Sequence, residues 1–401
     1  MGPSDQSIEG GCPLSRGSIL RILLALVTNE VGISRGRSSQ SLPVTELNEA
    51  TRLDGSGLDL DSLERLTASA AVNEYFRLHE TGAEDYLLSL ATVGEWCDLV
   101  LQSRAANGTH LTFRTSGSTG TPKPCTHAVV DLTVEVDAWA RLLGPVERVV
   151  SLVPAHHIYG TIFTALLPDR LSIECLSMRS GGLASVSRAI PGTLVVGTPT
   201  MWAYLARSLP VFPRGLMGIS STAPLPATLA RELHSRGLER LIEIYGSSET
   251  GGIAYREDPA SAFALLDHWR HDGDDILSRD TIDGGRATHR TMDDVTWWDE
   301  RRFTIGGRRD GAVQVGGHNV YPERIRRRLL EHRHVAEAAV RLDAVTGRLK
   351  AFVVPTAAAV DRCSTEELDT WCAVLRDVER PRPITIGAAV PRTSMGKLAD
   401  W

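Results

Sequence analysis

A loop rich in glycine and hydroxyl side chains is the strongest chemical signal in the sequence. It reads TSGSTGTPK and contains Thr115, Ser116, Gly117, Ser118, Thr119, Gly120 and Lys123. Glycines let backbone N–H groups close around phosphate oxygens, hydroxyl groups add donors, and the lysine adds positive charge. The spacing is not that of a Walker A loop. The loop therefore predicts a phosphate site, although a Ser/Gly-rich surface loop would have the same composition.

This loop resembles the signature of the adenylate-forming superfamily, which contains acyl- and aryl-CoA synthetases. Downstream, IYGSSET at residues 244–250 is similar to the family's YGxTE motif, and STAPL at residues 221–225 is similar to the strip that lines the adenine pocket. The resemblance implies five roles in nucleotide binding: Ser248 at the α-phosphate, Glu249 on Mg²⁺, Tyr245 stacked on adenine, and Thr222 and Ala223 beside the adenine.

Two further residues resemble the family's ribose contacts. Asp293 aligns with the ribose-binding aspartate, although Met292 stands where the family has glycine. Arg308 follows at the interval that the family uses and would be the second ribose contact, and Asp310 would be the hinge of the small domain. The simpler alternatives are that Asp293 caps a turn and that Arg308 is a solvated charge.

Two motifs near the C-terminus complete the resemblance. The segment GGHNVYP, which begins with Gly316 and Gly317, resembles the loop beside the pantetheine tunnel, and PRTSMGK ends at Lys397, the family's adenylation lysine. Lys397 would offset negative charge while a carboxylate attacks the α-phosphate of ATP. A rotation about Asp310 would then withdraw it, so that a thiol could attack the acyl-AMP. An isolated C-terminal lysine is otherwise a solvated tail residue.

The acid substrate is expected to meet a set of small, aromatic and histidine side chains. HHIYG at residues 156–160 resembles a segment of the 4-coumarate–CoA ligase type, in which the histidine lies beside the carboxylate. That resemblance assigns His157 to catalysis and places Tyr159, Trp202, Gly246 and Ser247 in the acid pocket. No basic residue occurs in these segments, so an uncharged acyl part is expected, with an aryl, hydroxybenzoate-like acid preferred. His157 could instead be a core histidine.

The elements that must position these residues predict an α/β fold in three parts. Apolar segments at 149–153, 171–176, 194–196 and 241–245 read as strands, and they alternate with helix-length segments, as in a mostly parallel sheet. We expect a helical region at 18–103, a polar linker at 104–110, a truncated large domain at 111–309, and a small mobile α+β lid at 310–401. Typical members of the family have a longer stretch before the phosphate loop.

The front region carries a separate signal. GLDLDSLE at residues 57–64 resembles the DSL motif of acyl carrier proteins at the start of a helix, and residues 92–100 resemble the carrier's last helix. By that resemblance Ser62 would bear phosphopantetheine. Because Asp and Ser are also preferred N-caps, Asp61 and Ser62 could simply begin a helix.

Composition excludes several other functions. The net charge of −6 comes with scattered Lys and Arg, so no basic stripe for nucleic acid is present. Six dispersed cysteines indicate reduced thiols. The apolar run at 19–27 is shorter than the roughly 20 residues of a membrane span. A cytoplasmic protein without nucleic-acid or membrane partners is expected.

The sequence thus predicts an acid–thiol ligase that uses ATP and Mg²⁺ to convert a small carboxylic acid to acyl-AMP. The acyl group would then pass to coenzyme A or to the phosphopantetheine of an acyl carrier protein. Two alternatives are a degenerate ligase that serves as a carrier-like docking module, and an adenylating enzyme with an amine or oxygen acceptor. Degeneration is disfavoured because Lys123, Glu249, Arg308 and Lys397 are all present.

Overall fold

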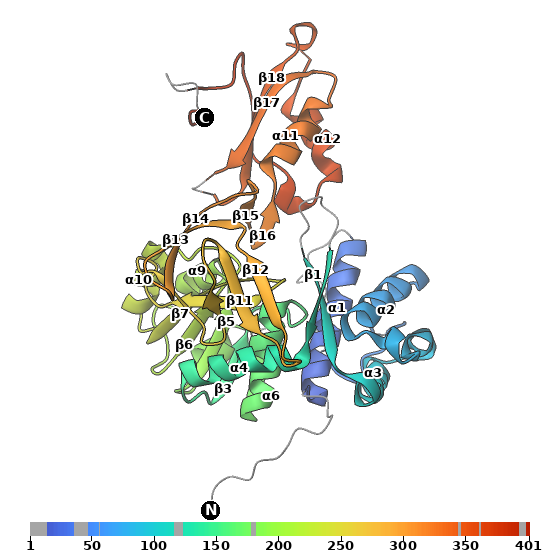
Figure 1. Cartoon of the computed structure of the whole chain (residues 1–401). Helices are drawn as coiled ribbons and strands as arrows, with labels where there is room; N and C mark the ends of the chain where they lie inside the picture. Colours follow the sequence, from blue (N-terminus) through green and yellow to red (C-terminus); the bar gives the residue numbers. More distant parts are fainter. Residues whose placement is uncertain are drawn as a thin grey trace, which may run out of the picture. The chain divides into compact units, whose positions relative to one another are not determined.

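The computed structural model describes residues 14–35, 47–55, 57–115, 123–177, 182–343, 346–360, 362–392 and 398–401. Contacts divide the chain into two compact units (Figure 1). The first unit contains residues 1–115, 123–290 and 297–304, and the second contains residues 116–122, 291–296 and 305–401.

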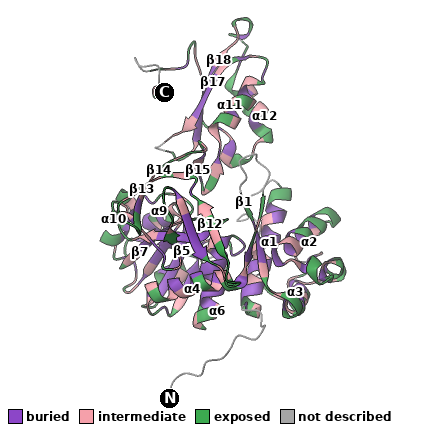
Figure 2. Cartoon of the chain, viewed as in Figure 1, coloured by how far each residue is buried: buried purple, intermediate pink, exposed green. Residues whose placement is uncertain are grey.

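Seven strands of a nine-stranded sheet lie in the first unit, whereas β13 (Asp293–Trp297) and β14 (Arg302–Arg308) are divided between the two units. The strand order of the sheet is β13, β14, β9 (Phe263–Leu265), β8 (Gly251–Arg256), β7 (Arg240–Ser247), β6 (Met217–Ser220), β5 (Thr193–Gly197), β3 (Arg148–Ser151) and β4 (Glu174–Ser177). Strands β4, β3, β5, β6 and β7 run parallel, whereas β8 pairs antiparallel with β7. The mixed α/β class is therefore confirmed. β5 is buried along its whole length (Figure 2), as in parallel strands covered on both faces.

All four predicted strands overlap observed ones. The largest difference is at 171–176, where the strand begins only at Glu174 because α6 (Leu167–Leu171) extends to Leu171. The other covering helices are α4 (Val129–Leu143), α5 (Ile158–Thr161), α8 (Ala184–Ser187), α9 (Pro199–Ser208) and α10 (Ala227–Ser235), and a π-helical turn, η4 (Ile162–Leu166), joins α5 to α6. A three-stranded sheet of β10 (Arg270–His271), β11 (Ile276–Asp280) and β12 (Arg286–Arg290) completes the unit.

The predicted phosphate loop joins two strands. β1 (His110–Thr115) pairs antiparallel with β2 (Lys123–Ala128), and Thr115 lies opposite Lys123. β2 separates the loop from α4, the first helix after it. The loop residues Ser116, Gly117, Ser118, Thr119 and Gly120 lie outside the described part of the chain.

The front helices share a core with the sheet of the first unit. They are α1 (Arg16–Ser34), α2 (Ser62–Phe76) and α3 (Val93–Asn107), with the short 3₁₀ segments η2 (Leu78–Glu80) and η3 (Ala83–Ser89) between the last two. The Tyr75 hydroxyl hydrogen-bonds to that of Thr161 at 2.7 Å, and the Tyr75 ring meets Phe113 edge-on at 5.3 Å. The Ser18 hydroxyl donates to the Ala165 carbonyl at 3.3 Å. The separate carrier-like domain at 18–103 and the domain boundaries at 111 and 310 stay predictions. Contacts group the front helices and the sheet in one compact unit.

α1 is also the one helix of the described residues that is long and apolar enough to cross a membrane. It has 19 residues and a mean hydropathy of 1.4 over the window concerned, of which 56% is buried inside the protein. The side chains of Ile19, Ile22 and Leu23 are fully buried. These contacts are those of a core helix in the first unit.

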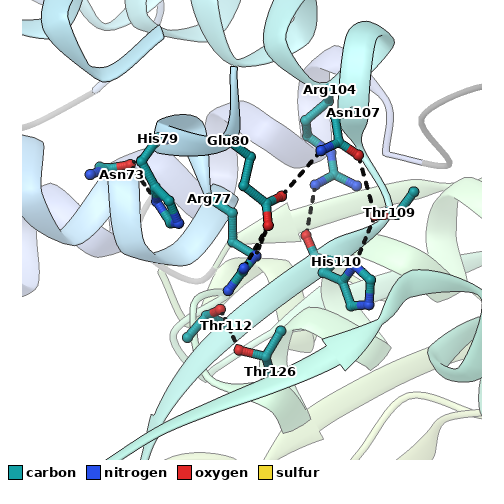
Figure 3. Close-up of polar contacts among 10 residues, drawn as sticks. All are labelled: Asn73, Arg77, His79, Glu80, Arg104, Asn107, Thr109, His110, Thr112 and Thr126. Carbon is teal, nitrogen blue, oxygen red and sulfur yellow. Dashed lines mark hydrogen bonds and ion pairs between the residues drawn. The ribbon is translucent and has the colours of Figure 1, made fainter. Parts of the chain in front are cut away.

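The predicted linker at 104–110 is mostly regular structure. α3 continues to Asn107 and β1 begins at His110. Arg104, which is 1% exposed, donates to the Gly108 carbonyl at 2.6 Å. It also donates to the His110 carbonyl at 3.2 Å (Figure 3). The Asn107 amide reaches Glu80 at 3.4 Å. This network fixes the helices to the hairpin that carries the predicted phosphate loop.

α2 begins with a capping box rather than with an apolar face. The Asp61 side chain accepts from Glu64 N–H at 2.8 Å, and Glu64 reaches back to Asp61 N–H at 3.2 Å. Glu64 is buried in an ion pair with Arg35, whereas Leu63 and Leu66 are 69% and 52% exposed. The spacing of these two leucines predicts an apolar helical face that includes both. The helix is present, but its buried face excludes both leucines.

The second unit contains a small α+β fold. Its elements are the hairpin β15 (Val313–Val315) and β16 (His318–Val320), α11 (Pro322–Leu330), β17 (Val335–Leu342), β18 (Leu349–Pro355), α12 (Thr365–Trp371) and β19 (Ile384–Ile386). β17, β18 and β19 form one sheet, and α11 and α12 pack on it around Ile325, Leu329 and Leu368. The sequence pattern predicts a helix near Thr365–Val378, but α12 ends at Trp371 and 3₁₀ turns follow.

Candidate active site

Most of the segments predicted to meet the nucleotide or the acid follow strands of the sheet at the same side, where the parallel strands end. Ser151 lies in register with Val196, Gly197 with Ser220, and Ser220 with Glu243. The carboxyl ends of β3, β5, β6 and β7 therefore come together, and the four motif segments at 156–160, 198–202, 221–225 and 245–249 begin there. In open α/β sheets, ligands bind in the crevice outside the carboxyl ends of the strands.

Hydrogen bonds tie these segments to one another. The Tyr159 hydroxyl donates to the carbonyls of Gly197 at 2.9 Å and Ile219 at 3.2 Å, which lie at the ends of β5 and β6. The Ser221 hydroxyl donates to the Ile244 carbonyl at 3.2 Å. Burial raises the pKa of Tyr159 well above its ordinary value, so the hydroxyl stays a donor at neutral pH. Tyr159 thus holds the edge together as a structural donor.

The YGSSET segment forms a tight turn at the end of β7. The Ser247 N–H donates to the Thr250 hydroxyl at 3.1 Å, and the Thr250 N–H donates to the Ser247 carbonyl at 3.3 Å. A Cβ on Gly246 would lie 2.2 Å from the Gly251 carbonyl oxygen, so only glycine fits this bulge. Glu249 is exposed at the tip, where a carboxylate oxygen is available to a Mg²⁺ ion.

Tyr245 and Ser248 are positioned by neighbours outside the motif. The Tyr245 ring packs against Phe263 at 5.9 Å and Phe303 at 5.7 Å. The Ser248 carbonyl accepts a hydrogen bond from His127 Nε2 at 2.7 Å, because a carbonyl can only accept. Burial lowers the pKa of His127, so the imidazole is neutral. The β2 strand that follows the phosphate loop is therefore bonded to the predicted Mg²⁺ turn.

Thr222 adopts a left-handed backbone conformation with φ of 78°. Such a conformation is rare for a β-branched residue and costs of order 1–3 kcal/mol. Strain of this kind is typical of ligand-binding turns, and Thr222 lies directly after β6 with its side chain exposed. The observation fits the predicted adenine strip, which includes the half-buried Ala223.

One functional residue was missed from the sequence. Glu135 of α4 is 1% exposed, and its Oε1 accepts from Gly252 N–H at 2.8 Å and from Trp139 Nε1 at 2.9 Å. Its second oxygen, Oε2, has no hydrogen-bond partner within the described ranges. Burial raises the pKa of Glu135 to about 7. A Cβ on Gly251, whose φ is 71°, would lie 2.2 Å from Oε2, so the carboxylate depends on this glycine.

A local signal for Glu135 was present in the sequence. The residue falls on the same helical face as Leu132, Val136 and Trp139, at spacings of three and four residues. An acidic residue on the apolar face of a helix needs a buried donor. The position of Glu135 supports the turn that carries Glu249, so we class it as a positioning residue.

The expected ribose contacts lie together in the second unit. Arg308 donates to both carboxylate oxygens of Asp310, at 2.8 and 2.7 Å, and its Nη1 is 4.0 Å from Asp293 Oδ1. Asp310 also accepts from the Tyr321 hydroxyl and from Ala312 N–H, each at 3.1 Å. The Arg308 guanidinium holds the pKa of Asp310 below its usual range. The predicted hinge residue is therefore anchored on both sides.

The predicted thiol loop is a two-residue hairpin turn. Val315 pairs with His318, and the intervening Gly316 and Gly317 have φ of 57° and 83°. Two consecutive positive φ values are what a type I′ turn requires, and glycine supplies them without strain. The turn joins β15 to β16.

His157 and Trp202 lie in contrasting environments. His157 is exposed before α5, and its carbonyl accepts from Thr161 N–H at 2.7 Å. Trp202 is 0% exposed within the core, with Nε1 donating to the Ile219 carbonyl at 3.0 Å. In this conformation Trp202 packs in the core next to the end of β6, and none of its surface is exposed to a substrate. Hollows of about 230 and 200 Å³ beside α4 contain none of the expected site residues.

Lysine is rare in this chain, and most of its lysines lie in the predicted ATP motifs. Only three of its 43 Lys and Arg residues are lysines, and two of the three, Lys123 and Lys397, belong to the predicted ATP motifs. Lys123 is exposed at the start of β2, and Lys397 lies outside the described residues. The third, Lys350, is buried and donates to Asp400 at 2.6 Å. A chain that otherwise uses arginine keeps lysine where a compact phosphate-binding charge is expected.

Comparisons with known proteins agree with this geometry. A family model described as AMP-binding enzyme matches residues 80–271. The chain is 39% identical over 389 residues to a 4-coumarate–CoA ligase of Halorhodospira halophila, covering 96% of this chain and 99% of that one. It is also 39% identical over 393 residues to a 4-coumarate–CoA ligase of Rhodobacter capsulatus, covering 96% and 100%.

Among solved structures, an amide bond synthetase of Marinactinospora thermotolerans has a TM-score of 0.62 at 19% identity, covering 97% of this chain and 96% of that one. This likeness concerns the fold alone. Since so little of either chain lies outside the two ligase alignments, those alignments include the front helices. The short front region is therefore shared with proteins of this group.

Proposed function

The chain belongs to the adenylate-forming family of AMP-binding enzymes that includes bacterial 4-coumarate–CoA ligases, and it is an AMP-forming acid–thiol ligase; we propose that its acid is an uncharged aryl acid of the coumarate or hydroxybenzoate class and that coenzyme A is the acceptor. The near full-length match to two proteins of that name is the observation that carries the proposal.

The composition of the sheet edge supports an uncharged acyl group. Residues 154–160, 197–202 and 245–248 contain no Lys or Arg. A second carboxylate on the acid would find no cationic partner in these segments, and burying an unpaired charge is costly. His157, exposed before α5, is the polar group that would meet the reacting carboxylate, and Gly246 and Ser247 would lie beside the ring of the acid.

The proposed nucleotide roles rest on the resemblance of these segments to the family's motifs. Bound ATP supplies the α-phosphate that the acid attacks, and Mg²⁺ would be held by Glu249 at the tip of the β7 turn. Ser248 and Thr115 with the loop after it would donate hydrogen bonds to phosphate oxygens, and Lys123 would add charge. In the second unit Asp293 and Arg308 would contact the ribose. Donors fixed in advance around the phosphates stabilise charge that develops in the transition state.

The two half-reactions would use different parts of the second unit. Lys397 would neutralise charge as pyrophosphate leaves, and the Gly316–Gly317 turn would flank the thiol during thioester formation. Asp310, held by Arg308 and Tyr321, would be the pivot between the two arrangements. A hinged lid of this kind excludes water and separates the two steps.

The experiment is an acid panel at fixed ATP, Mg²⁺ and coenzyme A. Thioesters formed from 4-coumarate, 4-hydroxybenzoate, a dicarboxylic aryl acid and a medium-chain fatty acid are quantified by mass spectrometry. We expect the monocarboxylic aryl acids to give the highest kcat/KM. A preference for the fatty or the dicarboxylic acid would overturn the aryl proposal. Transfer to a carrier protein or an amine, but not to coenzyme A, would overturn the acceptor.

A further inference from the structure

Three potential metal ligands meet in the second unit, away from every residue assigned above. His332 and His334 lie in the turn between α11 and β17, and Glu367 lies in the first turn of α12. The donor atoms of the three side chains all lie within 4.8 Å of one another. His332 Nε2 is 3.4 Å from Glu367 Oε1, and His334 Nδ1 is 3.1 Å from Glu367 Oε2.

The backbone holds these side chains in place. His332 N–H donates to the Leu329 carbonyl at 3.1 Å, and the His332 carbonyl accepts from Val335 N–H at 2.9 Å. The His334 carbonyl accepts from Thr356 N–H at 2.8 Å. On the other side Glu367 N–H is capped by the Ser364 hydroxyl at 3.1 Å. The cluster is therefore built on fixed positions of two neighbouring elements.

The distances and the surroundings suit one small cation. Donors bound at roughly 2.0–2.2 Å in a tetrahedral site lie about 3.3–3.6 Å apart, close to the two observed N–O separations. His332 is 8% exposed, His334 17% and Glu367 30%, so the cluster is partly shielded yet open to entry. The Trp371 ring closes one side, with its centroid 5.1 Å from that of His332.

We propose that His332, His334 and Glu367 form a zinc-class metal site that ties α12 to the turn between α11 and β17. Two imidazoles and one carboxylate suit Zn²⁺ or a similar transition metal, whereas Mg²⁺ and Ca²⁺ prefer all-oxygen sites. Three protein ligands leave a position for water. Each imidazole must be neutral to bind the metal. When Nε2 of His332 binds the metal, the ring proton lies on Nδ1. Nδ1 can then no longer accept the 3.4 Å hydrogen bond from the His334 N–H.

The simpler reading is that the carboxylate only accepts hydrogen bonds from two histidines. Metal titration separates the two readings without any use of activity. Full-length protein stripped with EDTA, in the absence of nucleotide, is titrated with Co²⁺ while visible absorption is followed, and with Zn²⁺ by calorimetry. The variants are Glu367→Gln, which keeps the size of the side chain, and His334→Ala. The control is His79→Ala, a histidine on an exposed part of the first unit.

We expect wild type and His79→Ala to bind one ion per chain with a Co²⁺ spectrum of low coordination number. Glu367→Gln and His334→Ala should lose at least about tenfold in affinity, since each removes one of three ligands. Zn²⁺ should raise the Tm of wild type but not that of Glu367→Gln, whose metal-free Tm shows that it is folded. No binding by wild type, or equal binding by Glu367→Gln, would overturn the site.

Discussion

Glu135 Oε1 accepts a hydrogen bond from the N–H of Gly252 at 2.8 Å, which joins the buried face of α4 to the strand that follows the predicted Mg²⁺ turn. The same oxygen accepts from Trp139, so a single carboxylate fixes the start of β8. Burial raises the pKa of Glu135 to about 7. The group that supports the turn therefore titrates near neutral pH.

Glu135→Gln should change how stability depends on pH. Burial raises the pKa of Glu135 in the folded protein from 4.5 to about 7. Its protonation therefore stabilises the fold fully below the pKa of the unfolded chain, and this stabilisation is lost as pH rises through the pKa of the folded protein. Glutamine keeps an acceptor oxygen and does not titrate. The free energy of unfolding of the variant, relative to wild type, should therefore rise by up to about 3 kcal/mol from pH ~4.5 to pH ~8.

Urea unfolding across that pH range measures this difference. Glu232→Gln, at an exposed position of α10, is the matched control and should show a nearly constant difference from wild type. A constant difference for Glu135→Gln as well would mean that Glu135 does not titrate in this range.

Asp310→Asn should weaken nucleotide binding through Arg308. The substitution removes one of two charge-assisted hydrogen bonds that orient the guanidinium. We expect KM for ATP to rise roughly tenfold, the loss typical of a hydrogen bond to a charged group, with less change in kcat. Tyr321→Phe removes only the 3.1 Å hydroxyl contact to Asp310 and should have a smaller effect. If kcat fell while KM for ATP stayed the same, Asp310 would act as a hinge without orienting Arg308.

Ser62 stays a predicted phosphopantetheine site, and its position makes the test simple. It is exposed at the first position of α2, directly after the Asp61 cap. Incubation with coenzyme A and several phosphopantetheinyl transferases should add one phosphopantetheine mass to wild type and none to Ser62→Ala. Ser89→Ala, another exposed serine of the front region, is the control. An unmodified wild type would leave the DSL segment as a helix start.

The fold class was predictable from the alternation of strands and helices, whereas the roles of the site residues stay predictions. The register of β3 to β7 brings together the ends of the strands that precede residues 156–160 and 244–250. Contacts far apart in sequence could not be predicted. Leu63 and Leu66 are exposed because the helix turns Glu64 toward the interior, where Glu64 pairs with Arg35, 29 residues away in the sequence. Glu135 meets its backbone donor, the N–H of Gly252, across 117 residues, so no short pattern reveals the pair.

Secondary structure failed where two readings fit the same residues. Residues 104–110 are polar and contain glycine, as linkers do, yet Arg104 is buried because its guanidinium satisfies two carbonyls of the α3–β1 connection. The strand β2 was missed because Lys123–Ala128 is short and follows directly on the loop.

Trp202 resembled a pocket residue, but glycines at 197 and 218 leave space for its ring inside the core.

In the proposed mechanism one chain performs two chemically distinct steps, and Lys397 serves only the first. Lys397→Ala is tested in both half-reactions: ATP–pyrophosphate exchange with the best aryl acid, and thioester formation from supplied acyl-AMP and coenzyme A. Arg392→Ala is the control, since it removes a neighbouring cation that pairs with Glu337 at 3.0 Å.

Exchange by Lys397→Ala should fall by about 100-fold or more, the effect of removing one charged group that stabilises the transition state. Thioester formation from acyl-AMP should stay close to wild type, because pyrophosphate has already left. Arg392→Ala should retain both activities. An equal loss of both half-reactions in Lys397→Ala, or an unchanged rate of exchange, would contradict the account.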